Sequence, residues 1–254
     1  AVDYVLSGAA FSRLIPAHLW FLYFLVIFYA AVLVLAPVLS RLSGTRFLAR
    51  LDAGYRRTVA GRGRVLVPAL VTLPLMLAMQ TWIVDTPASW FPPVHLLAYY
   101  ALFFAFGWML YRHRDLIAAF GRGWKANLAV ANLLVLPVSV VLLALGKAAE
   151  DGGGPAGGWR FAVFVASALY TWLMVCGLWG AFLRWFAVER RWVRYLADAS
   201  YWCYLMSITP IVLLQFWVKD WPVPGMVKYV VVVALTMAVL LASYEWCVRY
   251  TVVG

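Results

Sequence analysis

Few side chains in this sequence could carry out acid–base chemistry, and His18 stands out among them. It is one of three histidines and begins a long apolar run that continues with Trp20 and further aromatic residues. An imidazole takes up and releases a proton near neutral pH, so His18 could act as an acid or base at the edge of a membrane. The alternative is an interfacial belt, in which Trp20 anchors the chain and His18 is simply solvated.

A second group of polar residues follows a helical spacing in the segment 199–218. Ser200, Tyr204, Ser207 and Gln215 recur at intervals that place them on one face of a helix. Such a stripe inside lipid either lines a passage or makes hydrogen bonds between helices, and the pattern alone leaves both open. Pro210 lacks an amide donor and predicts a bend in this helix.

Other chemical motifs are not supported. Cys176, Cys203 and Cys247 have no metal-type spacing, and we expect buried thiols and no metal site. The glycine-rich stretch 151–158 predicts a flexible loop and not a phosphate-binding motif, because no Lys-Ser/Thr pair follows it. His95, which follows two prolines, fits an interfacial histidine better than a ligand.

Composition identifies the elements that must position these residues. Of the 254 residues, 66% are hydrophobic and 12% are charged, whereas an average soluble domain is about a quarter charged. A membrane-crossing helix needs about 20 apolar residues. Runs that are apolar on all sides exclude a β-barrel with a watery lumen. We therefore predict an all-α integral membrane protein with seven transmembrane helices, at 18–39, 65–84, 94–111, 126–146, 159–182, 199–218 and 225–248.

The basic residues predict the orientation of these helices. Lys and Arg number 21 against 10 Asp and Glu, and most of them lie in the connectors after the first, third and fifth segments and after the last. Because cytoplasmic connectors are enriched in Lys and Arg, the N-terminus is predicted outside and the C-terminus in the cytoplasm. Orientation accounts for the whole basic excess, so no nucleic-acid partner is expected.

Four stretches carry a resemblance to a known family. They are HLWFLYFLVIFY at 18–29, YYALFFAFGWMLY at 99–111, YLADASYWCYLMSITP at 195–210 and SYEWCVRYTVVG at 243–254. In order and spacing they resemble motifs of the membrane acyltransferase-3 family, notably the branch that acylates periplasmic glucans and other surface glycans. One position departs from the family pattern, because Ser207 stands where the family usually has a histidine.

The resemblance implies a ten-helix bundle with both termini in the cytoplasm. Seven helices that begin outside would then be the C-terminal portion of a single transmembrane acyltransferase-type domain, here residues 1–254, without its first helices. In the family those helices carry the catalytic histidine, some eleven residues after an Arg or Lys. No such pair occurs in this sequence. On this interpretation the isolated chain is expected to be inactive.

The resemblance also implies a function. It predicts a multi-pass enzyme of the inner (plasma) membrane that moves an acetyl, succinyl or similar group from acyl coenzyme A to a hydroxyl of an extracytoplasmic glycan. Acyl coenzyme A is a co-substrate, and no bound cofactor is expected. We expect His18 and Trp20 at the acceptor mouth. The other candidates are passage residues, Tyr201, Tyr204 and Ser207, and coenzyme-phosphate residues, Arg56, Arg57, Arg62 and Arg64.

Two other functions are compatible with several apolar helices. A retinal-binding receptor shares the seven-helix topology but needs a lysine deep in a helix, whereas Lys219 and Lys228 lie at the predicted outer boundary. A transporter or a non-catalytic glycan-export subunit is the stronger alternative. It would use acidic residues inside the membrane for ion coupling, and Glu245, near a helix end, is a weak candidate.

Overall fold

The computed structural model describes residues 17–42, 44–86, 91–188 and 190–251. Throughout these ranges all regular elements are helices and no strand occurs, so the predicted all-α class is confirmed. The residues form two compact units, one ending at Trp185 and the other beginning at Phe186. The N-terminus, which is predicted to be extracytoplasmic, lies outside the described residues.

Five helical stretches are long and apolar enough to cross a membrane, and two bent helix pairs raise the number to as many as seven. This agrees with a multi-pass membrane protein. The five stretches are α3 (Trp20–Leu42), α6 (Val94–Arg112), the run of α8 (Trp124–Val130), a π-helical turn (Ala131–Val135) and α9 (Leu136–Asp151), α10 (Gly157–Phe186) and α13 (Gly225–Cys247). The bent pairs are α4 (Arg46–Ala60) with α5 (Leu66–Leu77) and α11 (Arg191–Met206) with α12 (Ile208–Val218).

The predicted helix at 65–84 is wrong in its second half, because α5 ends at Leu77. The next amides, those of Gln80 and Thr81, donate to the side-chain carboxylate of Asp85 instead of to helix carbonyls. The twelve residues of α5 rise only about 18 Å, short of a bilayer core of about 30 Å. The basic connector before α5 is also a helix, α4, and the two are bent by 96°.

The predicted helix at 199–218 is broken into two. It begins earlier, at Arg191, and α11 and α12 meet at Ser207 with a bend of 67°. Pro210 explains the break, because without an amide hydrogen it cannot donate to the carbonyl of Met206 four residues earlier. The bend expected from Pro210 is therefore confirmed.

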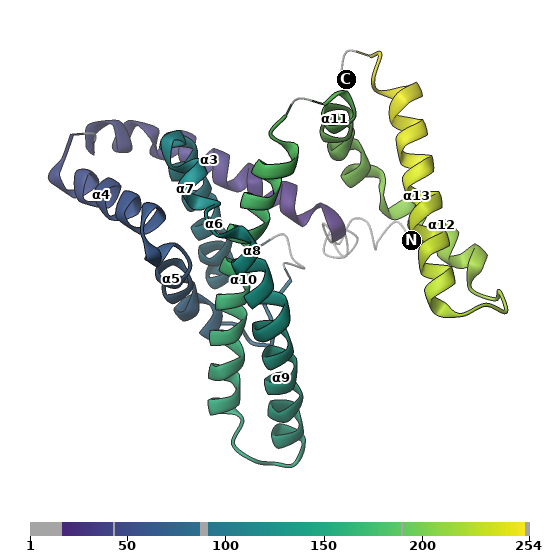
Figure 1. Cartoon of the computed structure of the whole chain (residues 1–254), viewed down its shortest axis with the longest axis horizontal. Coiled ribbons are helices and arrows are strands. Elements are labelled where there is room, and N and C mark those ends of the chain that lie inside the picture. The colour runs from purple at the N-terminus through teal and green to yellow at the C-terminus, as the bar shows by residue number, and fades with distance from the viewer. Residues whose placement is uncertain (1–16, 43, 87–90, 189, 252–254) are drawn as a thin grey trace, which may run out of the picture. The chain divides into compact units, whose positions relative to one another are not determined.

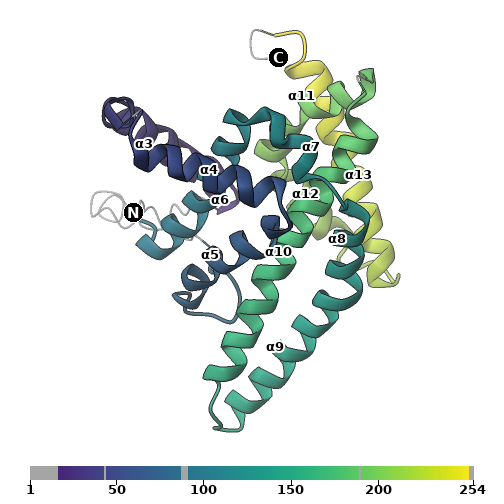
Figure 2. The ribbon, with the colours of Figure 1, turned by 60° about the vertical axis from the view of Figure 1, so that its left-hand side comes forward.

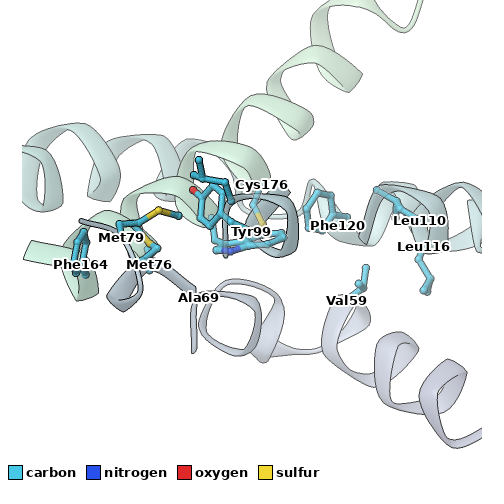
Figure 3. Packing of buried hydrophobic residues seen from close by; sticks show 13 residues of the cluster. Val59, Ala69, Met76, Met79, Tyr99, Leu110, Leu116, Phe120, Phe164 and Cys176 are labelled. Carbon is cyan, nitrogen blue, oxygen red and sulfur yellow. The ribbon is translucent and has the colours of Figure 1, made fainter. Parts of the chain in front are cut away.

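The core of the first unit lies between α5, α6 and α10. It runs along these helices from Phe164 and Met79 at one end to Leu110 and Leu116 at the other (Figure 3). Trp172 of α10 is fully buried in the middle, where its ring stacks on Phe103 at 5.3 Å between centroids. Its indole Nε1 donates to the hydroxyl of Thr72 at 2.9 Å. This bond satisfies a polar group that would otherwise be costly in an apolar core.

Close packing holds α8 against α10, which runs beside α9 in both views (Figures 1 and 2). A Cβ added to Gly180 would overlap the carbonyl oxygen of Gly121 and lie 2.5 Å from Cβ of Trp124. Small residues let membrane helices approach in this way. Pro137, two residues after the π-helical turn ends, explains that turn, because it removes an amide donor and crowds the preceding carbonyl.

Replacing Gly180 by alanine is therefore expected to destabilise the protein by about 1–3 kcal/mol, since backbone atoms of Gly121 cannot move aside as a side chain could. Thermal unfolding in detergent measures the change. Gly158→Ala on the same helix is the control, because nothing lies within 4 Å of a Cβ there. Equal melting temperatures for the two variants would contradict the packing argument.

The second unit consists of α11, α12 and α13. Ala199 of α11 is fully buried against Tyr244 and Val248 at the end of α13. The indole of Trp202 donates to the hydroxyl of Ser243 at 3.0 Å, which joins α11 to α13 through a polar contact. Interhelical hydrogen bonds of this kind are common in membrane bundles.

The orientation follows from charge alone, and labelling can test it. Pro155, in the turn between α9 and α10, and Ala53, on α4, are both exposed and are predicted on opposite sides of the membrane. In a background without native cysteines, an impermeant maleimide added to intact cells should label Pro155→Cys and spare Ala53→Cys. The reverse pattern would overturn the orientation.

Candidate functional site

The first unit brings two of the three histidines to one end of the helices. The helices α3 and α6 pack in parallel, because Trp20 and Phe24 contact Tyr100, and Phe28 contacts Phe104. The beginnings of both helices therefore lie at the same end. His18 is half-buried in a 3₁₀ turn (Ala17–Leu19) just before α3, and His95 is the second residue of α6. We call this the histidine end; the charge pattern predicts that it faces outward.

The predicted acceptor residue Trp20 is packed between elements. Its ring lies 5.1 Å from that of Tyr100 and 6.0 Å from that of Phe24, between centroids. These contacts fix the start of α3 against α6, and they place His18, two residues earlier, beside this aromatic cluster. Trp20 is half-buried, so part of the indole stays accessible at the histidine end.

Asp85 is held beside His95 by the loop that follows α5. Its carboxylate accepts the amides of Gln80 and Thr81 and, at 2.7 Å, the hydroxyl of Thr81. Burial alone would raise the pKa of Asp85, but these hydrogen bonds and the nearby imidazole of His95 hold that pKa below its usual value. The carboxylate Oδ2 lies 3.8 Å from Nε2 of His95. An ionised carboxylate thus faces one nitrogen of the ring and can orient it.

The loop itself is fastened to two other helices. Arg160 of α10 donates to the carbonyl of Met79 at 2.7 Å, and the indole of Trp82 donates to Glu150 of α9 at 2.7 Å. A fixed loop is what a positioned Asp–His pair requires. His95 was predicted as an interfacial histidine, and its pairing with Asp85 could not be read from the sequence because it depends on the end of α5 at Leu77.

Asp85→Asn is expected to open this loop. The folded pKa of Asp85 is lowered, so its carboxylate stabilises the loop above the usual pKa of an unfolded aspartate, and the stabilisation is lost as the pH falls through the folded pKa. At neutral pH the variant should raise hydrogen exchange of the segment 78–86 by about ten-fold or more, as expected when hydrogen bonds to a charged group are lost.

The matched control is Asp220→Asn, because among the described residues the exposed Asp220 has a single ion-pair contact, 3.8 Å from Lys219. It should leave exchange in its own turn unchanged. Unaltered exchange in Asp85→Asn would show that the carboxylate does not hold the loop.

A charged network lies at the opposite end of α6. Arg56 of α4 pairs with Asp115 at 2.6 Å and contacts Nδ1 of His113 at 3.2 Å, while Nε2 of His113 lies 3.1 Å from Asp52. A guanidinium can only donate, so Nδ1 must accept and Nε2–H must donate to Asp52. Arg112 adds a contact to Asp52 at 3.5 Å. The network fixes α4 to the end of α6. We call this the arginine end.

The four predicted coenzyme arginines are only partly brought together. Arg56 already has Asp115 as a partner, and Arg57 is exposed one residue further along α4. Arg62 and Arg64 share the 3₁₀ turn Arg62–Arg64 between α4 and α5, where Arg62 is exposed and Arg64 half-buried. Sequence reasoning missed His113. The sequence could have indicated it, because His113 is one of only three histidines and lies between Arg112 and Asp115.

An apolar pocket of about 330 Å³ opens near the arginine end. Its walls come from α6, α7 (Ile117–Phe120) and α10, and they include Phe106, Trp172 and Trp179. Gly107 lies at the pocket and is exposed, and nothing is within 4 Å of a Cβ added there. The volume is at the lower end of the range of small-molecule sites, and the lining suits an apolar chain or acyl group.

The predicted passage residues lie on the α11 side of the break in the helix, with Tyr201 and Tyr204 on α11 and Ser207 at its end. Tyr201 is 74% exposed and lies with Arg191, Arg194 and Arg249 along a groove of about 910 Å³. Ser207 stands at the break and donates to the carbonyl of Tyr204 at 3.1 Å. The stripe expected to continue from Ser200 to Gln215 is therefore not one helix face, and no straight passage follows from it.

Comparison with known proteins decides the family. Residues 3–245 match the family model of the acyltransferase 3 type, which is described as an acyltransferase domain. The chain belongs to the acyltransferase 3 family. No curated protein and no solved structure gives a match. The resemblance inferred from the four motifs is confirmed at the level of the family.

Membership of the acyltransferase 3 family relates the two polar ends of the helices to acyl transfer. The protein is an acyltransferase-type membrane protein, and its apolar helices separate the histidine end from the arginine end. An acyl transfer needs a group that deprotonates the acceptor and a site that holds the donor. Histidines with an oriented carboxylate suit the first task, and arginines beside an apolar pocket suit the second.

Proposed function

We propose that this acyltransferase moves an acetyl- or succinyl-type group from cytoplasmic acyl coenzyme A to a hydroxyl of an extracytoplasmic glycan, in the inner (plasma) membrane. The observation that carries the proposal is the division of polar chemistry between the two ends of α6. His95 with Asp85 lies at its beginning, and the network of Arg56 and His113 lies at its end. A proton-accepting group at one end and cationic groups at the other are what a transfer from a coenzyme to a hydroxyl requires.

The arginine end is the proposed donor site. Coenzyme phosphates are anionic, and arginine binds phosphate oxygens in a bidentate manner. The exposed Arg57 and Arg62 are better placed for this than Arg56, whose guanidinium is engaged by Asp115. The apolar pocket beside Phe106 and Trp172 would take the acyl group with part of its thioester arm.

The histidine end is the proposed acceptor site. Removal of a proton makes a sugar hydroxyl competent to attack the thioester carbonyl. The new carbon–oxygen bond then replaces the carbon–sulfur bond, and coenzyme A leaves as a thiolate that is protonated. His18 and Trp20 are proposed to contact the acceptor. The pair of His95 and Asp85 is a second candidate for holding the proton. We also propose that the acyl group or the acceptor contacts Tyr201, Tyr204 and Ser207 on its way to the site of transfer.

Reconstitution tests this proposal against a transporter or a non-catalytic glycan-export subunit. The full-length gene product in liposomes would be given acetyl coenzyme A and a neutral glucan, and the free coenzyme thiol would be followed by a thiol reagent. An acyltransferase releases thiol in proportion to an alkali-labile ester on the glucan. Glucan movement across the bilayer without thiol release would favour the transporter.

A further inference from the structure

The groove on the second unit combines a basic rim with an apolar wall. It lies between α11 and the end of α13 and measures about 910 Å³. Arg191, Arg194 and Arg249 supply the positive charge, and Trp202, Leu205 and Val248 supply the apolar lining. A second groove of about 700 Å³ continues from it past Arg190 and shares Arg191 and Arg194.

The arginines of this groove are not equivalent. Arg249 is neutralised by Glu245, to which it donates two hydrogen bonds of 2.6 and 2.9 Å. Among the described residues no carboxylate forms an ion pair with Arg191 or Arg194. Asp198 lies in the same groove but not within ion-pair distance of either. The groove thus offers two uncompensated guanidinium groups to an anion.

The surrounding helix adds to this positive potential. The first turn of α11 contains no acidic residue, and its N-cap residue Arg190 makes no side-chain capping hydrogen bond. The unsatisfied amides at the start of a helix carry partial positive charge. Arg191 belongs to this first turn, and Arg194 lies one turn further along, so the charges of the side chains and of the helix have the same sign at the groove.

We propose that this groove binds the phosphate headgroup of an anionic phospholipid, with an acyl chain of the lipid against Trp202, Leu205 and Val248. Phosphate could also come from a soluble coenzyme. A lipid fits better, because the basic rim continues into an apolar wall and α13 is long and apolar enough to cross the membrane. Charge complementarity between juxtamembrane arginines and an anionic leaflet is the physical basis. The site goes beyond the proposed transfer reaction and does not depend on it.

Native mass spectrometry of the full chain in detergent tests the proposal. Phosphatidylglycerol and phosphatidylcholine with identical chains would be titrated, and the dissociation constant of the first bound lipid compared. We expect binding of phosphatidylglycerol to be at least about ten-fold tighter, and Arg191→Gln with Arg194→Gln to remove this preference. Arg191→Lys with Arg194→Lys keeps the charge and should keep most of the preference.

The control is Arg46→Gln with Arg50→Gln, two exposed arginines of α4 on the same predicted side of the membrane. It removes the same charge and should leave the preference unchanged. Equal loss in the control would mean that only general charge attraction operates. Equal affinity for the two lipids would overturn the site. Displacement of phosphatidylglycerol by acetyl coenzyme A or inorganic pyrophosphate would assign the groove to a soluble phosphate and overturn the lipid proposal.

Discussion

Gly107→Leu is expected to lower acyl transfer by about 100-fold while the protein folds normally, because loss of correct positioning alone can cost that much. Gly107 lies at the apolar pocket proposed for the acyl group, and a Cβ there meets no atom within 4 Å. A leucine can therefore occupy the pocket without displacing the backbone of α6. The effect should be larger for succinyl than for acetyl donors, because the longer group needs more of the 330 Å³.

The measurement is the rate of transfer from each acyl coenzyme A to a glucan, together with melting temperature and membrane abundance. Gly54→Leu is the matched control, since Gly54 on α4 also has nothing within 4 Å of an added Cβ and lies away from the pocket. Full activity in Gly107→Leu would exclude this pocket from the donor site.

His18→Gln in the full-length gene product is expected to lower transfer by about 100-fold, the usual contribution of a general acid or base. Glutamine preserves polarity and approximate size, so the 3₁₀ turn before α3 and the contact between Trp20 and Tyr100 should survive. Ser207→His, which restores the residue type common in the family, should give little gain, because Ser207 occupies the break between α11 and α12.

The pH profile separates a chemical from a structural role of His18. If the imidazole handles a proton, His18→Gln should change the pH dependence of the transfer rate as well as its size. Near-wild-type transfer with an unchanged profile would leave the motif at 18–29 as a packing and anchoring signature.

The sequence predicts the helices well where apolar length alone decides them. The helices α3, α6, α10 and α13 agree with the predicted segments within a few residues, since long apolar runs have no other stable form in a membrane. The prediction of a helix over 65–84 is wrong after Leu77, where α5 ends, for a local reason. The amides of Gln80 and Thr81 donate to the carboxylate of Asp85 instead of to helix carbonyls. Hydrophobic periodicity does not reveal that a side chain competes with the helix for these amides.

The candidate site was harder to predict because its partners come from separate elements. Arg56 was predicted near the coenzyme phosphates, because a basic connector shows its charge but not its partners, whereas the structure pairs Arg56 with Asp115 and His113. Likewise, the role of His95 depends on a loop that was expected to be helix. Tyr201 was predicted as a passage residue, but the structure places it in the basic groove beside Arg191 and Arg194.

The decisive test of transfer across the membrane is the side on which donor and acceptor must be present. Radiolabelled acetyl coenzyme A, which does not cross membranes, would be added outside sealed inside-out vesicles that contain the full-length gene product and enclose a glucan. We expect alkali-labile label on the enclosed glucan, and no label on glucan outside right-side-out vesicles given the same donor. Label on glucan outside right-side-out vesicles, or label only on glucan that shares the donor's compartment, would contradict transfer across the membrane.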